Sequence, residues 1–289
     1  MDWGFLLILS TPLILAALGE VVGQKSGVLN IGLEGMMLMG AFAGYWVAIK
    51  GNSPYLALAV GIGFGGVLAL ISAYFTVKLR SDQVVVGTAV NFLALGLTGL
   101  GYRRAFGEPS QLPAMPELAS IGPIDAVTAT TVLLIPLLWL AINRTKWGLA
   151  LRACGEYPKA VEASGFSVNK IRMTALLIGG LLAGLAGAYL SVGVARSFAE
   201  GMTAGRGFLA IALVTFGRWH PAWTAVAALV LGYTQSLQYS LQGRPIFGVQ
   251  VPSQLWLALP YVVALAVLVL VGSGSASPGA LGRPYEKEG

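Results

Sequence analysis

The chain has 289 residues, of which 56% are hydrophobic and only 10% are charged, and its mean hydropathy is +0.76. A soluble globular domain carries about 25% charged residues, so this composition excludes one and predicts a single integral membrane domain over residues 1–289. The net charge of +6 comes from Lys and Arg scattered between apolar runs, which does not fit a nucleic-acid partner. With one cysteine, Cys154, and one histidine, His220, no Cys/His-built metal site is expected.

Apolar runs long enough to cross a membrane, which takes about 20 residues, recur along the chain. They predict an all-α, polytopic fold with about eight full transmembrane helices. The predicted spans are roughly 4–22, 31–49, 55–77, 84–102, 124–143, 173–195, 221–241 and 254–271. A further apolar segment, 206–217, is too short to cross, so we predict a half-helix or re-entrant segment there. Such a segment is typical of a transport path.

The Lys and Arg residues indicate an orientation. If residue 1 lies outside, about two thirds of the 18 Lys and Arg residues fall in inner loops, in agreement with the positive-inside rule. The sequence therefore predicts an outer N-terminus and a cytoplasmic C-terminal tail over residues 272–289.

Residues 144–172 form the longest predicted inner loop and the most charged stretch of the chain. Pro158 suits the first position of a helix, and Gly165 suits a left-handed residue that ends one. A short helix over 158–164 is therefore predicted on the inner membrane face. It could receive mechanical work from a soluble motor, or it could merely rest at the interface. The residues alone favour the second interpretation.

Four segments carry longer motifs. They are GExxGxKSGVLNIGLEGMMLMGAF from Gly19 to Phe42, RAxGExPxA from Arg152 to Ala160, GRGFxAIALV from Gly205 to Val214, and PxALGxPY from Pro278 to Tyr285. Together they resemble the permease subunits of bacterial ABC importers for nucleosides and simple sugars. The resemblance covers nearly the whole chain and is closest in length to the shorter of two paired permeases in nucleoside importers.

This resemblance implies a transport subunit of the bacterial inner membrane that is not an enzyme and binds no cofactor. Its implied partners are a second homologous permease, a substrate-binding lipoprotein outside the membrane, and an ATP-binding subunit that holds ATP and Mg²⁺. The implied substrates are nucleosides, with simple sugars such as ribose or galactose as the alternative. A secondary transporter or channel is a less favoured alternative. The resemblance also implies a coupling helix at Glu156, Pro158, Lys159, Ala160, Glu162, Gly165 and Phe166.

The segment Gly19–Ser26 nearly matches the phosphate-binding pattern GxxxxGK[ST]. Gln24 stands where the pattern has its second glycine, and the segment follows a predicted span where the pattern requires a strand. No ATP site is therefore expected on this chain.

Two acidic residues, Glu20 and Glu34, lie within or next to predicted spans. An ionised group at the centre of a bilayer is costly. Both residues are expected to approach the cytoplasmic interface or Lys25, which favours a structural or gating role over proton coupling.

Four further side chains are candidates for the transport pathway. Asn91 lies near the middle of the fourth span, where a contact between helices is favoured over a substrate contact. Phe92 could stack on a nucleobase, although packing is the commoner role of such a residue. Gln235 and Gln238 are three residues apart and therefore share one helix face, which could line the path.

Small residues at four-residue spacing predict faces where helices pack closely. The pairs are Gly40 and Gly44, Gly61 and Gly65, and Gly180 and Gly184. A faint similarity between residues 30–45 and 209–233 also suggests an inverted repeat, an arrangement that places a substrate path between two halves.

Overall fold

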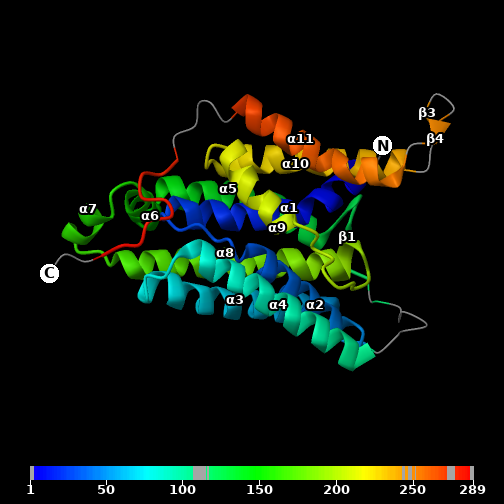
Figure 1. The fold of residues 1–289 in the computed structure, drawn as a ribbon, viewed down its shortest axis with the longest axis horizontal. Coiled ribbons are helices and arrows are strands. Elements are labelled where there is room, and N and C mark those ends of the chain that lie inside the picture. Colours follow the sequence, from blue (N-terminus) through cyan, green and yellow to red (C-terminus); the bar gives the residue numbers. More distant parts are fainter. Residues whose placement is uncertain are drawn as a thin grey trace.

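Helices make up nearly all of the computed structural model, which describes residues 3–106, 115, 117–242, 245–246, 249–250, 252–271 and 277–286. The helices lie roughly along one long axis (Figure 1). In chain order they are α1 (Trp3–Lys25), α2 (Leu33–Ala48), α3 (Pro54–Ala73), α4 (Gln83–Phe106), α5 (Ala126–Arg144), α6 (Lys146–Glu156), α7 (Pro158–Ala163), α8 (Val168–Tyr189), α9 (Arg206–Phe216), α10 (Pro221–Leu241) and α11 (Ser253–Val271). Two π-helical turns, η1 (Tyr74–Lys78) and η2 (Leu190–Val194), extend α3 and α8.

Two short antiparallel hairpins depart from the all-α prediction. Strand β1 (Ser120–Ile121) pairs with β2 (Ile124–Asp125), and β3 (Pro245–Ile246) pairs with β4 (Val249–Gln250). Both hairpins lie at the end of the bundle where the chain begins (Figure 1). They close connections between helices and leave the helical architecture unchanged.

Five helical segments of the described chain are long and apolar enough to cross a membrane. They are Trp3–Lys25, Pro54–Lys78, Gln83–Ala105, Ala126–Arg144 and Val168–Val194, while Arg206–Phe216 and Gln254–Val267 are shorter apolar helices. A multi-pass helical membrane protein is thus confirmed. The number of full-length spans found in this way is smaller than the eight predicted.

Helix α2 is one reason for the difference. The predicted span 31–49 contains a helix of only 16 residues, about 24 Å long at 1.5 Å per residue, against a hydrocarbon core of about 30 Å. Gly27, with φ of +89°, ends α1, and the amide of Val28 donates back to the carbonyl of Gly23 at 3.1 Å. Residues 26–32 then continue without helical structure. The predicted spans already left residues 23–30 between helices, so the difference is that α2 begins two residues later than the predicted span and ends one residue earlier.

Helix α9 is as short as predicted for the segment 206–217. It has 11 residues, about 16 Å of helix, and is bounded by Gly205, which has φ of +81°, and by Gly217. The predicted loop 144–172 is more ordered than expected. It contains α6, α7 and the first turn of α8.

Helices α2, α3 and α8 pack closely along their lengths (Figure 1). A Cβ atom added to Gly184 of α8 would lie 2.4 Å from the carbonyl oxygen of Gly61, and one added to Gly40 would lie 2.3 Å from that of Gly184. Neither position has room for a side chain, so the glycine faces predicted from four-residue spacing are confirmed as packing faces.

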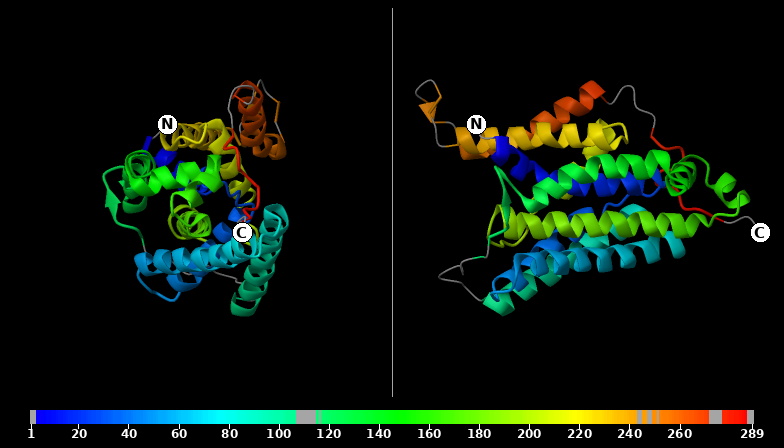
Figure 2. Two further views of the ribbon diagram at one scale, coloured as in Figure 1. Left: turned by 90° about the vertical axis from the view of Figure 1, so that its left-hand side faces the viewer. Right: turned by 180° about the vertical axis from the view of Figure 1, so that it is seen from behind.

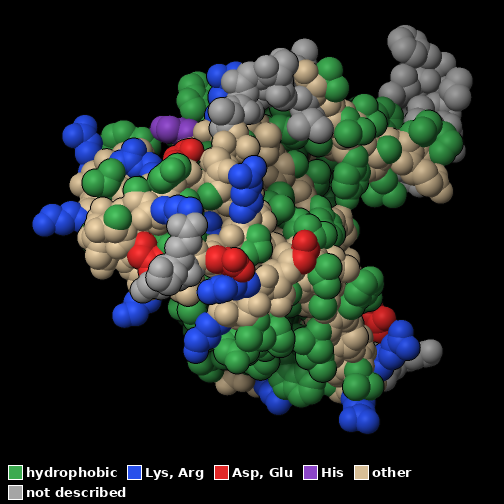
Figure 3. Space-filling model, turned by 60° about the vertical axis from the view of Figure 1, so that its left-hand side comes forward, with side chains coloured by type: hydrophobic (Ala, Val, Ile, Leu, Met, Phe, Trp, Pro, Cys, Tyr) green, Lys and Arg blue, Asp and Glu red, His purple; other side chains and the backbone are tan. Residues whose placement is uncertain are grey.

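The segments predicted to be inner loops gather at one end of the bundle. Helices α6 and α7 lie at this end together with the tail residues 277–286 (Figures 1 and 2), and we call it the α7 end. Lys25, Arg152 and Arg218 meet there around one cavity. Many Lys and Arg side chains cover this end, whereas the flanks of the bundle are largely hydrophobic (Figure 3).

Candidate functional site

The amino ends of the two short helices, α2 and α9, meet at the side chain of Glu34. Its Oε1 accepts a hydrogen bond from the amide of Gly205 at 2.7 Å, and its Oε2 accepts one from the amide of Gly207 at 2.6 Å. The first amides of a helix are otherwise unpaired and carry a partial positive charge, so a carboxylate is well placed there. A Cβ on Gly207 would lie 2.5 Å from the backbone nitrogen of Glu34, so glycine is required at this contact.

Asn91 of α4 fixes the same junction from the other side. Its Oδ1 accepts from the amide of Gly35 at 2.8 Å, and its Nδ2 donates to the carbonyl of Ile31 at 3.0 Å. The amide side chain thereby replaces helical hydrogen bonds that the broken segment before α2 cannot make. The contact between helices that was favoured for Asn91 is present.

The position of Glu34 corrects the expectation that it approaches the cytoplasmic interface or Lys25. Its neighbour Asn91 lies eight residues into α4, about 12 Å along the helix axis from the end where Arg80 pairs with Glu286 of the tail. Glu34 therefore lies well inside the bundle. The reason is that the chain reaches this depth through residues 26–32 before α2 begins.

Glu20 is buried in a separate polar network. Its Oε1 accepts from Nε2 of Gln24 at 2.9 Å and from the amide of Asn30 at 3.2 Å. Gln24 in turn accepts a hydrogen bond from the indole nitrogen of Trp219 at 2.7 Å. Glu20 thus joins α1 to the segment after it. Lys25 is not among its hydrogen-bond partners in the described chain.

Gln235 and Gln238 of α10 line two adjoining cavities. The larger cavity, of about 380 Å³, lies between α1, η2, the loop after it and α10. The smaller cavity, of about 100 Å³, lies between α9, α10 and α11. Gln235, Tyr239 and Arg206 line both of them, and Gln238 lines the smaller one.

The two glutamines are only 7% and 6% exposed, and neither amide has a hydrogen-bond partner among the residues that the structure describes. Arg206 was not singled out from the sequence as a pathway residue, although its motif GRGF was noticed. Its Nη1 donates to the carbonyls of Met202 and Thr203 at 3.0 and 3.3 Å. Phe92 lies elsewhere, because it is 70% exposed and lines neither cavity.

Helix α7 projects from the α7 end of the bundle (Figure 1). Pro158 is its first residue, and Gly165, with φ of +84°, follows its last turn, as the sequence predicted. Val161 is the buried residue of the helix, whereas Lys159 and Ala160 are exposed. Most of the helix surface is therefore open, and Val161 is the side chain that packs it into the bundle.

The remaining residues predicted for coupling lie on either side of this helix. Glu156 at the end of α6 is exposed, Glu162 in α7 is partly exposed, and Phe166 is 51% exposed. Helix α6 was not predicted. It begins at the N-cap Thr145, whose Oγ1 accepts from the amide of Gly148 at 3.0 Å.

The described part of the predicted tail 272–289, residues 277–286, crosses the base of α6 and α7. The amide of Ala280 donates to the carbonyl of Gly155 at 2.8 Å, and the amide of Gly282 donates to that of Gly27 at 3.0 Å. The guanidinium of Arg172, at the start of α8, donates to the carbonyl of Arg283 at 2.8 Å. The tail therefore joins the α1–α2 connection, the end of α6 and the start of α8.

Two acidic residues of the coupling segment also bind this tail. Oε2 of Glu156 accepts from the amide of Gly279 at 3.1 Å, and the hydroxyl of Tyr285 donates to the carboxylate of Glu162. A cavity of about 670 Å³ lies between the tail and the start of α7. The single cysteine, Cys154, is buried beside this region, and burial raises the pKa of its thiol, which opposes nucleophilic chemistry.

A bundle of apolar helices in which two short helices meet, with an exposed loop helix at one end, is typical of a polytopic membrane permease. The family described as "branched-chain amino acid transport system / permease component" matches residues 4–272. The chain belongs to this family.

Individual relatives agree with this assignment. The guanosine ABC transporter permease protein NupQ of Bacillus subtilis is 34% identical over 97% of this chain and 95% of its own length. The nucleoside ABC transporter permease protein NupC of Lactococcus lactis is 30% identical over 98% and 95%. The putative glucose ABC transporter permease protein TsgC13 of Haloferax volcanii is 34% identical over 96% and 95%.

Among solved structures, an inward-facing putative metal-chelate type ABC transporter shares the fold. Its TM-score is 0.51 at 16% sequence identity, over 92% of this chain and 84% of that one. At this identity the likeness concerns the fold alone.

Proposed function

We propose that this chain is the permease subunit of an ATP-driven ABC importer that takes up nucleosides across a bacterial inner membrane. Relatives that carry nucleoside or guanosine in their names match it over nearly its whole length. The glucose permease relative supports simple sugars of the ribose and galactose type as the alternative. ATP and Mg²⁺ would be held by a separate ATP-binding subunit. A second homologous permease and an external substrate-binding lipoprotein would complete the importer.

The proposed orientation places the α7 end in the cytoplasm and the start of α1 outside. The basic side chains gathered at the α7 end (Figure 3) support this assignment through the positive-inside rule. The possible inverted repeat is supported by α2 and α9, which leave the Glu34 junction in opposite directions. Helix α9 runs toward the α7 end, where Trp219 bonds to Gln24, whereas α2 packs at its far end, through Tyr45, against Phe198.

The observation that carries the coupling proposal is the placement of α7. It is exposed at one end of the bundle, and residues 164–167 connect it directly to α8, which packs closely on α2 and α3. A displacement of α7 by a docked ATPase would therefore pass into the centre of the bundle. ATP-driven docking needs only to favour one arrangement by a few kcal/mol to shift the population usefully.

The Glu34 junction is the proposed gate. It joins two half-helices well inside the bundle, where non-helical backbone is tolerated around a transport path. Asn91 would hold the α2 side of this gate, and Glu34 would hold the α9 side. Phe92 remains a candidate for contact with the paired permease or with lipid, because it lies on the exposed face of α4.

Transport by the purified complex tests the proposed function. The permease pair, ATPase and lipoprotein are reconstituted in liposomes, and uptake of labelled guanosine, uridine and ribose is measured with and without ATP and lipoprotein. Nucleoside uptake is expected only when both are present. Uptake with neither would overturn the ABC assignment in favour of a secondary transporter or channel, and uptake of ribose alone would select the sugar alternative.

The coupling role is tested by Ala160→Trp, which adds bulk to the exposed surface of α7. We expect substrate-stimulated ATPase activity to fall at least tenfold, because the helix could no longer seat in a cleft of the ATPase. Ala119→Trp, at an exposed position near the opposite end, is the matched control and should keep full stimulation. Equal activities of the two variants would contradict the coupling role of α7.

A further inference from the structure

The two cavities beside α10 are lined by hydrogen-bonding groups that have no partner among the described residues. Gln235 and Gln238 are more than nine-tenths buried, and both line cavity walls. Neither side-chain amide bonds to another group in the described part of the chain. Their amide atoms are not among the fully covered polar atoms of the described chain, which agrees with their place on the cavity walls. Two amides on one helix face that open onto a cavity are suited to a polar solute, or to the water that it displaces.

One charged side chain, that of Arg206, lines both cavities, and no carboxylate lies within ion-pair distance of it among the described residues. Glu34 lines neither cavity, but its carboxylate accepts from the amides of Gly205 and Gly207, on either side of Arg206 in the chain. The same turn of α9 therefore carries one positive side chain and holds one negative one, which favours a solute without net charge. The guanidinium still offers N–H donors to carbonyl and hydroxyl oxygens.

The cavity walls also offer aromatic surface. Tyr239 lines both cavities, and Tyr261 lines the smaller one. The hydroxyl of Tyr261 is already used, because it donates to the carbonyl of Ala204 at 2.6 Å, so its ring is the part left for a ligand. The larger cavity, at about 380 Å³, lies within the range of small-molecule sites, about 300–1,000 Å³. Amides, a guanidinium and aromatic faces in this volume match the hydroxyls, carbonyls and base of a nucleoside.

We infer that the cavities between α1, η2, α9, α10 and α11 form a substrate-contact site, in which Gln235, Gln238 and Arg206 hydrogen-bond a neutral nucleoside during its passage. This inference rests on the proposed function and adds the place and the chemistry of recognition. The site adjoins the Glu34 junction, because residues 205–207 belong to both. A nucleoside in the cavity would therefore contact the first turn of α9, whose amides Glu34 holds.

Selectivity among nucleoside analogues tests the site in the complete importer. Gln235→Met and Gln238→Met keep the length of the side chain and remove its amide. Uptake is measured at saturating, ligand-loaded lipoprotein, so that differences in delivery do not contribute. The substrates are guanosine, 2′-deoxyguanosine and inosine, each analogue lacking one hydrogen-bonding group. We expect guanosine uptake to fall about three- to tenfold per lost hydrogen bond, while uptake of at least one analogue is unchanged.

Recovery of the intact complex by size-exclusion chromatography checks that both variants fold and assemble. Gln242→Met, at an exposed glutamine that follows the same helix, is the matched control and should leave all uptake ratios unchanged. Ratios that stay within twofold of the wild type in both cavity variants would overturn the site, even when nucleoside uptake itself is ATP-dependent. Faster uptake of guanosine monophosphate than of guanosine would overturn the neutral class of ligand.

The location of the site and the identity of the substrate are tested separately. If the wild-type complex takes up ribose and no nucleoside, the proposed nucleoside function is wrong. Ribose and 2-deoxyribose then replace the nucleoside pair in the same variants. A changed ratio of the two sugars in Gln235→Met or Gln238→Met supports the location of the site, and an unchanged ratio in both overturns it.

Discussion

Two helix contacts in this protein are built in opposite ways. Where α3 meets α8, the backbones touch, and a Cβ on Gly65 would lie 2.4 Å from the carbonyl oxygen of Gly180. Nearby, the buried hydroxyl of Ser191 in η2 is paired with the carbonyl of Ala41 at 2.8 Å. Where α10 meets α9 and α11, a cavity separates the side chains, and the amides of Gln235 and Gln238 on its wall have no partner in the described chain.

The difference indicates that the two contacts have different roles within one bundle. The α2–α3–α8 contact has no space for a solute, and its close backbones suit a stiff body that transmits a push from α7. The α9–α10–α11 contact has space and glutamine amides that no described residue pairs with, and it suits a region that accepts a solute and adjusts to it. The Glu34 junction connects the two regions, because it joins α2 to α9.

The largest effect is expected from Gly184→Val, which would damage the stiff region. The added atoms would meet the backbone of Gly61 and of Gly65, and overpacking of this kind costs about 1–3 kcal/mol or more. We expect little folded protein after detergent extraction, measured by size-exclusion chromatography. Gly63→Val is the control, since a Cβ there would meet nothing within 4 Å. Normal folding of Gly184→Val would refute the description of this contact as rigid.

An intermediate effect is expected at the junction between the two regions. Glu34→Gln removes the charge and one of the two acceptor oxygens that hold Gly205 and Gly207, and hydrogen bonds to charged groups contribute about 1.5–3 kcal/mol. We expect a lower midpoint of thermal unfolding and slower transport, with α7 and ATPase docking intact. Glu117→Gln is the matched control, because the Glu117 side chain is 72% exposed in its pair with Arg196. Equal unfolding midpoints for the two variants would show that the hydrogen bonds of Glu34 do not stabilise the fold.

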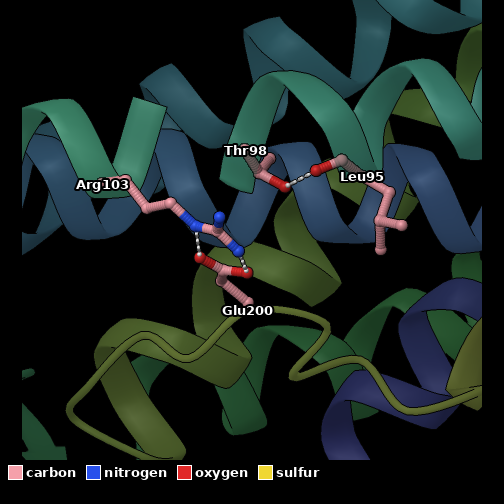
Figure 4. Close-up of polar contacts among 4 residues, drawn as sticks. All are labelled: Leu95, Thr98, Arg103 and Glu200. Atoms are coloured by element: carbon pink, nitrogen blue, oxygen red, sulfur yellow. Dashed lines mark hydrogen bonds and ion pairs between the residues drawn. The ribbon is translucent and has the colours of Figure 1, made fainter. Parts of the chain in front are cut away.

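The smallest effect is expected at the end opposite to α7, where Arg103 of α4 binds Glu200 in the loop before α9 through two contacts of 2.8 and 3.0 Å (Figure 4). The hydrogen bond from Arg103 lowers the pKa of the Glu200 carboxyl. The ion pair is therefore complete at neutral pH and is lost as the pH falls through this lowered pKa. Both groups are solvent-exposed, so Arg103→Gln should leave the unfolding midpoint nearly unchanged.

Measuring the unfolding midpoint as a function of pH tests the expected small effect of Arg103→Gln more sharply. Wild type and Arg103→Gln should unfold alike in acid and differ slightly, if at all, at neutral pH. A large difference at neutral pH would mean that this exposed pair holds the loop before α9 in place, and that the cavity region is stiffer than its packing indicates.

Much of the fold could be predicted from hydropathy, because lipid requires long apolar helices with internally paired backbones. The exceptions are instructive. Residues 31–32 were placed in a span but are not helical, and the segment before them is held by distant residues, as where the amide of Leu29 donates to Oε1 of Gln83 at 2.8 Å. Helix α6 carries charge and lies outside the apolar runs, so its amphipathic pattern was counted as loop.

Those parts of the candidate site that depend on local sequence signals could be predicted. The shared face of Gln235 and Gln238 follows from their spacing, and the bounds of α7 follow from Pro158 and Gly165, since all of these signals are local. The partner of Glu34 lies 171 residues away in sequence, and no local pattern could identify it. Arg206 was overlooked as a pathway residue because its cavity is formed by helices from both ends of the chain.

The tail has a consequence for how the protein is made. Residues 279–283 form hydrogen bonds with the α1–α2 connection, the end of α6 and the start of α8, yet they leave the ribosome after all of these. While α11 is still being synthesised, α6 and α7 are already present without these hydrogen bonds. Synthesis of residues 279–283 is therefore the step that completes this surface, and an insertion within them would remove these contacts even if every span inserted correctly.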